Sequence, residues 1–189
     1  MKRYLLNTLL ILVLLPTRAG VVNAMTPTIT PADRSEILNL ISNYSHRFDN
    51  RDGSGWAQLY TEDGEWIAYP NGADTPVVHL RGTEMLEQYS TERIVMFTKA
   101  NIVTRHFMVN TLFDLVSSEQ VNTSSMAFIT WQRPTLKDFK PQPVQSGYYT
   151  HIIVKKNDVW KFKRVEVHTN GLYTPEEVYN STQAQARTE

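Results

Sequence analysis

The chain has 189 residues, of which 41% are hydrophobic and 20% charged, with 19 basic and 19 acidic side chains and no cysteine. No basic stripe runs along the chain, which argues against a nucleic-acid partner. The missing thiol excludes cysteine nucleophiles, thiolate metal sites and disulfides. We therefore expect one globular domain whose stability rests on its apolar core.

The first 24 residues have the layout of a secretory signal peptide. Lys2 and Arg3 form a positive start, an apolar run covers residues 5–15, and Val22-Asn23-Ala24 fits a cleavage site made of small residues. The run is too short to span a membrane, and no later segment is a transmembrane candidate. The sequence therefore predicts an exported protein, periplasmic or secreted, whose mature chain starts near Met25.

A first helix is expected to begin at Thr30-Pro31-Ala32-Asp33, where threonine suits the N-cap, proline the first helical position and aspartate a capping box. Apolar side chains then recur at helical spacing and predict one buried face, made of Ile37, Leu40, Ile41, Tyr44 and Phe48. Asp49 follows at the carboxyl end, where the helix dipole disfavours a carboxylate. It is either a solvated end residue or a residue with a function.

The middle of the chain alternates short elements. After a loop of turn-forming residues, Trp56, Leu59 and Tyr60 indicate a short second helix that ends at Asp63-Gly64. Two short strands and a third helix are then predicted, over residues 65–69, 77–80 and 84–98.

Strands dominate the second half. They are predicted over residues 102–116, 121–133, 145–155 and 159–167, with Asn157-Asp158 as a hairpin turn signal between the last two. Three helices followed mainly by strands indicate an α+β fold, in which long antiparallel strands form a curved sheet that covers the helices and leaves a pocket between the layers. The domain would span residues 25–173, and residues 174–189 would form a polar tail.

The strand over residues 102–116 holds a residue suited to acid–base chemistry. Successive strand side chains point to opposite faces, so one face is expected to carry Thr104, His106, Met108, Asn110 and Leu112. The other is expected to carry Val103, Arg105, Phe107, Val109 and Phe113. His106 is either a satisfied core histidine or a site residue, because histidine is intermediate in burial and is also the commonest general base.

Several separate motifs together resemble the SnoaL-like group of the nuclear transport factor 2-like superfamily. They are, in chain order, the helix ending at residues 44–52, Leu59-Tyr60-Thr61-Glu62-Asp63-Gly64, Arg81-Gly82, Thr104-Arg105-His106 with Asn110, Gly147-Tyr148-Tyr149-Thr150-His151 and Val159-Trp160-Lys161-Phe162. The resemblance covers about Asp33 to His168. It implies a cone-shaped α+β barrel, with an antiparallel or mixed sheet wrapped around three helices and an internal pocket.

Within this group the chain resembles members that use an Asp–His pair, of the scytalone dehydratase and hexachlorocyclohexane dehydrochlorinase type. The resemblance places Asp49 and His106 on that pair and Tyr69 on a first-strand tyrosine. It implies a lyase or isomerase without a cofactor, in which His106 removes a proton from carbon, Asp49 orients the imidazole and Tyr69 bonds a substrate oxygen. No metal is expected either, because His106, His151 and His168 lack zinc-ligand spacing.

Six further residues are expected at a small, largely apolar substrate: Tyr44, Phe48, Met108, Asn110, Tyr149 and His151. His151 shares a strand face with Tyr149, so it lines the pocket or sits in a sheet interface. An alternative function is also open, a non-catalytic module of the same fold that binds a small ligand or a partner chain.

The apolar face that holds Phe107 and Val109 predicts an interface. If His106 faces the pocket, this face points away from the helices, and no predicted element is long enough to cover it. Large exposed apolar patches usually mark interfaces, and twofold pairing is the commonest arrangement. We therefore expect a homodimer, with a trimer also compatible with the resembled fold. The alternative is that residues 134–143 or the carboxyl-terminal tail cover this face.

Overall fold

Three helices and six strands make up the part of the chain that the computed structural model describes, residues 28–134 and 140–171. The helices are α1 (Pro31–Asp49), α2 (Gly53–Ala57) and α3 (Thr83–Lys99). The strands are β1 (Tyr60–Pro70), β2 (Val78–Arg81), β3 (Val103–Ser117), β4 (Gln120–Gln132), β5 (Gln142–Lys156) and β6 (Val159–Gly171). No helix within these ranges has the length and apolar character needed to cross a membrane. The predicted signal peptide and polar tail lie outside the described residues.

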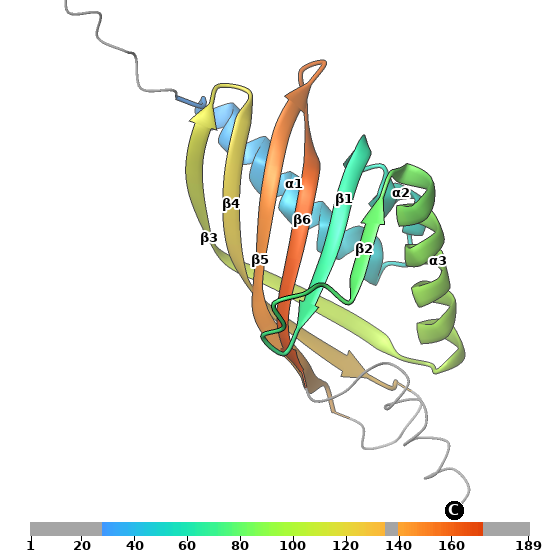
Figure 1. Cartoon of the computed structure of the whole chain (residues 1–189). Coiled ribbons are helices and arrows are strands. Elements are labelled where there is room, and N and C mark those ends of the chain that lie inside the picture. Colours follow the sequence, from blue (N-terminus) through green and yellow to red (C-terminus); the bar gives the residue numbers. More distant parts are fainter. Residues whose placement is uncertain (1–27, 135–139, 172–189) are drawn as a thin grey trace, which may run out of the picture.

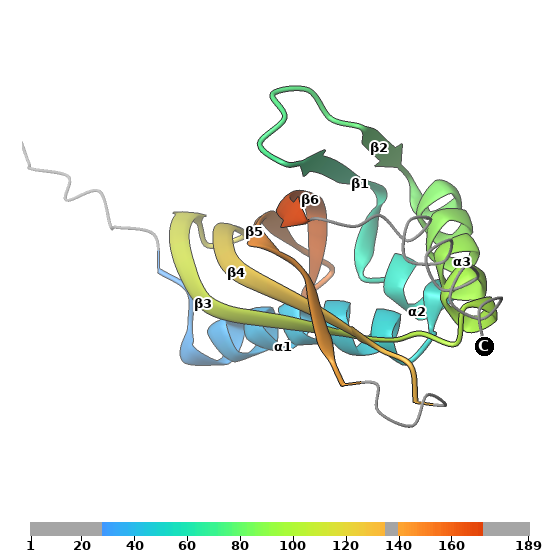
Figure 2. The same ribbon diagram turned by 90° about the horizontal axis from the view of Figure 1, so that it is seen from below.

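The strands form one sheet in the order β2-β1-β6-β5-β4-β3. All neighbours are antiparallel except β1 and β6, which are parallel. Helix α1 crosses one face of this sheet, and α3 lies beside β2 (Figure 1). Seen from below, the long strands curve over α1 (Figure 2). The predicted α+β fold with a curved, mixed sheet is confirmed, and the sheet is open, with β2 and β3 as its two edges.

The start of α1 is held by the expected capping box and by contacts to the far end of the chain. Thr30 Oγ1 accepts from the Asp33 backbone N–H at 3.0 Å, and Asp33 Oδ2 accepts from the Thr30 N–H at 3.2 Å. Asp33 Oδ1 also accepts from Lys155 Nζ and Trp160 Nε1, each at 2.9 Å. The Lys155 ammonium holds the pKa of the Asp33 carboxyl well below its usual range. These bonds fix α1 against the β5–β6 hairpin and so set the direction in which its carboxyl end points.

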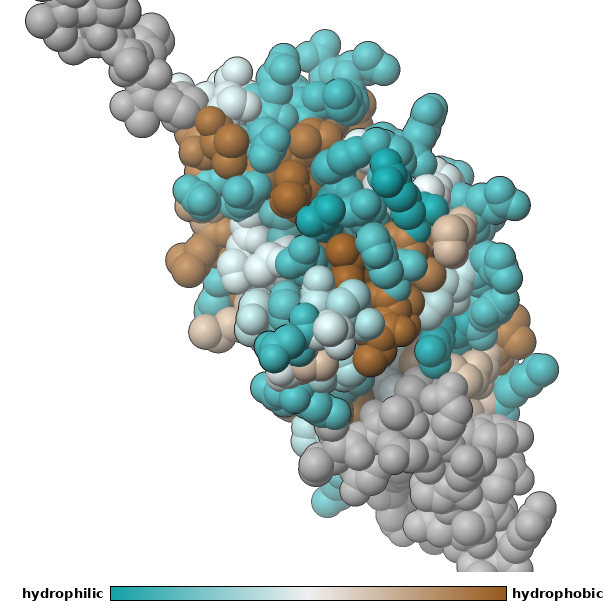
Figure 3. All heavy atoms as spheres, in the orientation of Figure 1, coloured by the Kyte–Doolittle hydropathy of each residue, from teal (hydrophilic) through white to brown (hydrophobic). Residues whose placement is uncertain are grey.

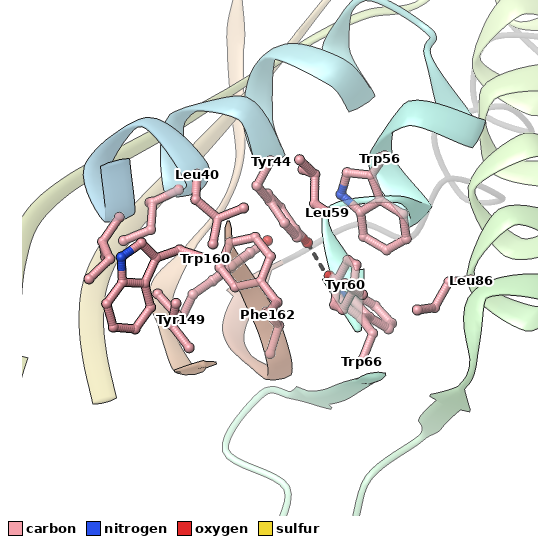
Figure 4. Close-up of a cluster of buried hydrophobic side chains, with 14 of the residues drawn as sticks. Leu40, Tyr44, Trp56, Leu59, Tyr60, Trp66, Leu86, Tyr149, Trp160 and Phe162 are labelled. Carbon is pink, nitrogen blue, oxygen red and sulfur yellow. Dashed lines mark hydrogen bonds between the residues drawn. The ribbon is translucent and has the colours of Figure 1, made fainter. Parts of the chain in front are cut away.

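The core fills the space between α1 and the sheet (Figure 4). Its largest buried side chains are aromatic, and Tyr44 from α1 and Trp66 from β1 point toward one another, with Trp66 Nε1 donating to Tyr44 Oη at 2.9 Å. Residues of the predicted α1 face contribute to this core, with Ile37, Leu40, Ile41 and Tyr44 all buried. The hydrogen bond satisfies two polar atoms that would be costly to bury alone.

Helix α2 is shorter than predicted, and Tyr60 is not part of it. Asp52 Oδ1 accepts from the Gly55 N–H at 2.8 Å, so the helix starts early, at Gly53. Tyr60 instead opens β1 and pairs with Phe162 of β6. The helical assignment of Leu59 and Tyr60 was therefore wrong, because pairing with a strand more than 100 positions away decides their conformation, and spacing within a short segment carries no information about that strand.

A bulge in β3 overturns part of the predicted face assignment. The β3–β4 register shifts between Val109 and Leu112, and Asn110 has a left-handed φ of 54°. An extra residue in one strand reverses the alternation beyond it. Leu112 is consequently 73% exposed. Phe113, expected to face outward, packs against the core under the Arg34 guanidinium, with Cζ 3.9 Å from its ring centroid.

The other side of the sheet, here called the outer face, carries exposed apolar side chains on β3, β4 and β5. They are Phe107, Val109, Leu112, Val116, Met126, Phe128 and Tyr148. Figure 3 views this face, and hydrophobic surface gathers there over β3 and β4 among polar side chains. Within the described residues, no helix packs on this side.

Candidate active site

Asp49 and His106 meet where the end of α1 passes β3. Asp49 Oδ1 lies 2.7 Å from His106 Nδ1, and Asp49 Oδ2 accepts from the His106 backbone N–H at 2.8 Å. Both side chains are largely buried, at 7% and 13% exposure. The two donors from one residue compensate the poor position of a carboxylate at a helix carboxyl terminus. The structure thus brings together two residues that are 57 positions apart.

This geometry sets the tautomer of the imidazole. An ionised carboxylate only accepts hydrogen bonds, so His106 Nδ1 carries the hydrogen that Asp49 receives. The lone pair then resides on Nε2. The ring is further held by Phe48, whose ring centroid lies 5.4 Å away at an interplanar angle of 80°. A ring held in one orientation with its lone pair on Nε2 is the arrangement that proton abstraction requires.

His106 lines a cavity of about 260 Å³ between the helices and the sheet. The volume is near the lower end of the usual range for ligand sites, about 300–1,000 Å³. Most of the wall is aromatic or aliphatic, made of Tyr44, Phe48, Trp56, Trp66, Ala68, Pro70, Val77, Val78, Tyr89, Phe97, Ile129, Trp131, Tyr149 and Val167. The polar remainder is Arg93, Thr104, His106, Gln145 and Thr169. Such a wall suits a small and largely apolar molecule.

Two buried tyrosines line this cavity. Tyr44 and Tyr149 are both buried, and their rings meet edge to face with centroids 5.8 Å apart. Burial raises the pKa of both phenols well above the usual value. They are therefore neutral near pH 7, and each hydroxyl carries its hydrogen. Tyr44, Phe48 and Tyr149, all expected at the substrate, line this cavity.

Tyr69 does not reach the cavity. Trp66, Ala68 and Pro70 of β1 line it, and the alternation of strand side chains turns Tyr69 to the outer face. There its ring stacks on His168 with centroids 4.7 Å apart, and His168 in turn stacks on Tyr148 at 4.6 Å. Tyr69, expected to bond substrate, therefore lies outside this cavity, because the strand presents the opposite parity of residues to the helices.

Two expected residues of β3 also lie away from the cavity. The bulge turns Asn110 outward, where its amide Nδ2 donates to Met126 Sδ at 3.5 Å. Met108 faces inward but packs against the core and does not line the cavity. Neither of these two residues, both expected at the substrate, therefore lines the cavity beside His106.

His151 occupies the core. It is 2% exposed, its Nδ1 lies 2.9 Å from Thr123 Oγ1, and its ring lies 5.3 Å from that of Phe162. Burial lowers the pKa of this imidazole to about 3. It does not line the cavity of His106, so the structural interpretation of His151 is the one that its surroundings support.

Sequence reasoning missed several residues of the wall, above all Arg93 and Thr104. Tyr89, Arg93 and Phe97 recur every four residues, which puts them on one face of α3. Thr104 precedes His106 by two and so shares its strand face. Those spacings could have identified both residues. Within the described residues there is also no group of three His, Asp or Glu side chains that could hold a metal ion.

Comparison with known proteins gives one family match. The family described as SnoaL-like domain matches residues 30–166. That range includes both Asp49 and His106. No curated protein matches the sequence.

Solved structures of the same fold come from several bacteria. One is a protein from Novosphingobium aromaticivorans provisionally assigned as a scytalone dehydratase, with 23% identity, a TM-score of 0.60, and coverage of 76% of this chain and 89% of that one. A protein of unknown function from Mycobacterium tuberculosis has 19% identity and a TM-score of 0.61, covering 84% and 94%. ActVI-ORFA from Streptomyces coelicolor has 18% identity and a TM-score of 0.59, covering 75% and 98%.

Proposed function

The chain belongs to the SnoaL-like domain family, and from that premise we propose that it is a cofactor-independent lyase or isomerase of the dehydratase type. Its substrate is a small, largely apolar molecule. The observation that carries the proposal is the pair of hydrogen bonds that Asp49 accepts from His106, at 2.7 Å from the ring and 2.8 Å from the backbone, at the wall of an apolar cavity.

The proposed reaction starts with proton transfer from a substrate carbon to His106 Nε2. The imidazolium that forms is stabilised by the adjacent Asp49 carboxylate, and such assistance typically contributes about 10²–10⁴-fold to the rate. In a dehydration the electron pair of the broken C–H bond forms the new carbon–carbon double bond, and the neighbouring C–O bond breaks. The imidazolium returns its proton to the leaving hydroxyl, so water departs and the neutral base is restored.

The hydroxyls of Tyr44 and Tyr149 complete the proposed mechanism. Charge develops on a substrate carbonyl oxygen when the adjacent carbon loses its proton. Neutral phenols at the cavity wall can donate hydrogen bonds to that oxygen, and preorganised donors in a dry site stabilise developing charge effectively. A solved structure of the same fold is provisionally assigned as a scytalone dehydratase, which supports a dehydratase reaction here.

The test is a screen of the purified protein against β-hydroxy ketones and other small dehydratable or dehydrohalogenatable compounds. We expect product formation, or deuterium uptake at the acidic carbon in heavy water, with wild type and not with His106→Gln. The matched control is His79→Gln, which changes a half-exposed histidine outside the cavity. If compounds bind saturably but no proton exchanges, the protein is instead a binding module of this fold.

We also propose that a second copy covers the outer face. Phe107 and Val109 are 49% and 47% exposed there, beside Met126 at 59% and Leu112 at 73%. Light scattering should give a dimer for the wild type and a monomer for Phe107→Glu combined with Val109→Lys. Val159→Lys is the control, since Val159 is 53% exposed but lies outside this patch. A monomeric wild type at micromolar concentration would contradict the pairing.

Export remains a further proposal, supported by the layout of residues 1–24. Mass spectrometry of protein recovered from outside the cytoplasm should show an amino terminus near Met25. An intact Met1 on that protein would contradict it.

A further inference from the structure

The hydroxyl of Thr104 is a buried polar group at the cavity, and its Oγ1 has no hydrogen-bond partner among residues 28–134 and 140–171. The side chain is 4% exposed and lines the cavity. Buried hydroxyls almost always have a partner, because an unpaired one has lost its contacts with water without a replacement. An oxygen of a bound ligand would supply the missing partner.

Thr104 also lies on the same strand as the proposed base. Strand residues two positions apart face the same side, and their Cα atoms are about 7 Å apart, so Thr104 and His106 meet the cavity next to each other. Tyr149, by contrast, lies on β5, two strands away from β3. A ligand oxygen bound by Thr104 is therefore close to the carbon that faces His106.

Trp56 carries the other buried polar atom of this kind on the cavity wall. Its Nε1 has no hydrogen-bond partner within the described part of the chain. Trp56 belongs to α2, however, and its ring packs on Tyr44 and Phe48 with centroids 5.4 and 6.0 Å apart. Of the two groups, Thr104 is the one that shares a strand face with His106.

We propose that Thr104 binds the oxygen that leaves the substrate, so that the site selects an alcohol, which loses water, over the corresponding halide. The inference rests on the proposed function, in which the imidazolium of His106 returns its proton to the leaving group. The leaving oxygen must then lie near His106 Nε2, the region that Thr104 adjoins.

The role of Thr104 in this step is that of a hydrogen-bond donor. When the C–O bond breaks, its electron pair stays with the oxygen, and the proton that completes the water comes from His106. Thr104 donates a hydrogen bond to that oxygen and keeps its own proton. Chlorine bound to carbon is a poor acceptor, and a site built to bond a hydroxyl binds an analogue without one less well.

The test uses two unreactive probes of nearly equal shape, a fluoroindanol and the matching compound in which a methyl group replaces the hydroxyl. Fluorine NMR measures the affinity of the full chain for each. Thr104→Val should weaken binding of the alcohol about fivefold relative to the methyl compound, and Thr104→Ser should keep the wild-type ratio of affinities. The control is Thr130→Val, which changes a threonine of β4 that does not line the cavity.

The ratio of the two affinities is the informative quantity, because a loosened cavity wall changes both affinities together. A wild-type ratio in Thr104→Val would overturn the inference. So would a ratio that changes equally in Thr130→Val or is lost in Thr104→Ser, and so would a wild type that does not bind the alcohol saturably.

Turnover separates this inference from the proposed reaction. On two substrates that differ only in the leaving group, Thr104→Val should lower kcat/KM about fivefold for the hydroxyl compound and less than twofold for the chloride. Turnover that depends on His106 but shows no such selectivity would leave the reaction in place and remove the role of Thr104. A changed probe ratio without turnover of any compound would instead overturn both the reaction and the leaving-group role, and leave Thr104 as a ligand-binding residue.

Discussion

Two Thr–His pairs face the inner side of the same sheet, and their surroundings are opposite. On β3, Thr104 lines a cavity and its Oγ1 has no hydrogen-bond partner within the described part of the chain, and His106 is held by a carboxylate. On β4 and β5, Thr123 is itself the partner of His151 at 2.9 Å, and apolar side chains surround the pair. The difference teaches that the proposed acid–base role of His106 rests on a carboxylate neighbour and a side open to the cavity, whereas burial accounts for the structural role of His151.

The largest expected effect concerns the two histidines directly. His106→Gln should lower kcat on the compound identified by the screen by about 10²–10⁴-fold, because it removes the base. His151→Gln should leave kcat of the folded protein within about twofold, since His151 lies outside the cavity. Steady-state kinetics on both variants measure this. A comparable loss of kcat in the two variants would contradict the assignment of His106 as the base and of His151 as a structural residue.

The second prediction concerns Asp49, the carboxylate that distinguishes the surroundings of His106 from those of His151. Asp49→Asn keeps the size of the side chain but removes the charge that selects the Nδ1–H tautomer and stabilises the imidazolium. We expect kcat to fall about 10²-fold, less than on loss of the base. Nitrogen-15 shifts of His106 should indicate the Nδ1–H form in wild type and a mixture of tautomers in the variant. An Nε2–H form in wild type would contradict the geometry.

Burial of His151 beside Thr123 should make the stability of the protein depend on pH. Burial lowers the pKa of His151 to about 3 in the folded protein, whereas an unfolded chain has about 6.5. Between these values the unfolded chain binds the proton and the folded one does not, so stability falls as pH falls from about 6.5. At pH 5 this amounts to about 2 kcal/mol relative to neutral pH.

Urea unfolding at neutral pH and at pH 5 measures that loss. His151→Gln should show a loss smaller by about the same 2 kcal/mol, and His79→Gln, at a half-exposed histidine, should behave like wild type. An unchanged pH dependence in His151→Gln would contradict the assigned role of burial.

The smallest effect sharpens the contrast between the threonines. Thr104→Val keeps the shape but removes a buried hydroxyl that has no partner among residues 28–134 and 140–171. Stability should therefore stay equal or rise, while kcat/KM falls about fivefold, or about 1 kcal/mol. Thr123→Val should lower stability instead, because it leaves His151 Nδ1 without its partner. Thermal unfolding of both variants tests whether their changes in stability have opposite signs, and kinetics test the change in kcat/KM. A stability loss in Thr104→Val would indicate a structural hydroxyl.

Local chemistry in the sequence was sufficient for several elements. The capping box at Thr30 and Asp33 formed as expected, since its donors and acceptors lie within three residues. Asn157 and Asp158, with left-handed φ values of 50° and 61°, make the predicted hairpin turn. Each depends on neighbours in the chain, which is why residue type alone carries the information.

The sequence predicted the pairing of Asp49 with His106 only in part. Periodicity placed Asp49 at the end of a helix and His106 in a strand, but it left both residues with a structural alternative. The resemblance to the SnoaL-like group supplied the contact. The structure contains it because α1 is anchored at Asp33 by Lys155 and Trp160, so that its other end passes β3.

Only the tertiary structure decided which side chains form the site. Alternation along a strand says that Trp66 and Tyr69 point to opposite faces, but not which of the two faces meets the helices. In β3 the bulge at Asn110 reversed the alternation, because one inserted residue is stable only against the pairing that β4 provides. Arg93 joined the cavity because the packing of α3 beside β1 turns one of its faces to the site. The sequence determined the elements and their relative parities, and packing determined the inward face, because burial is settled between segments that are distant along the chain.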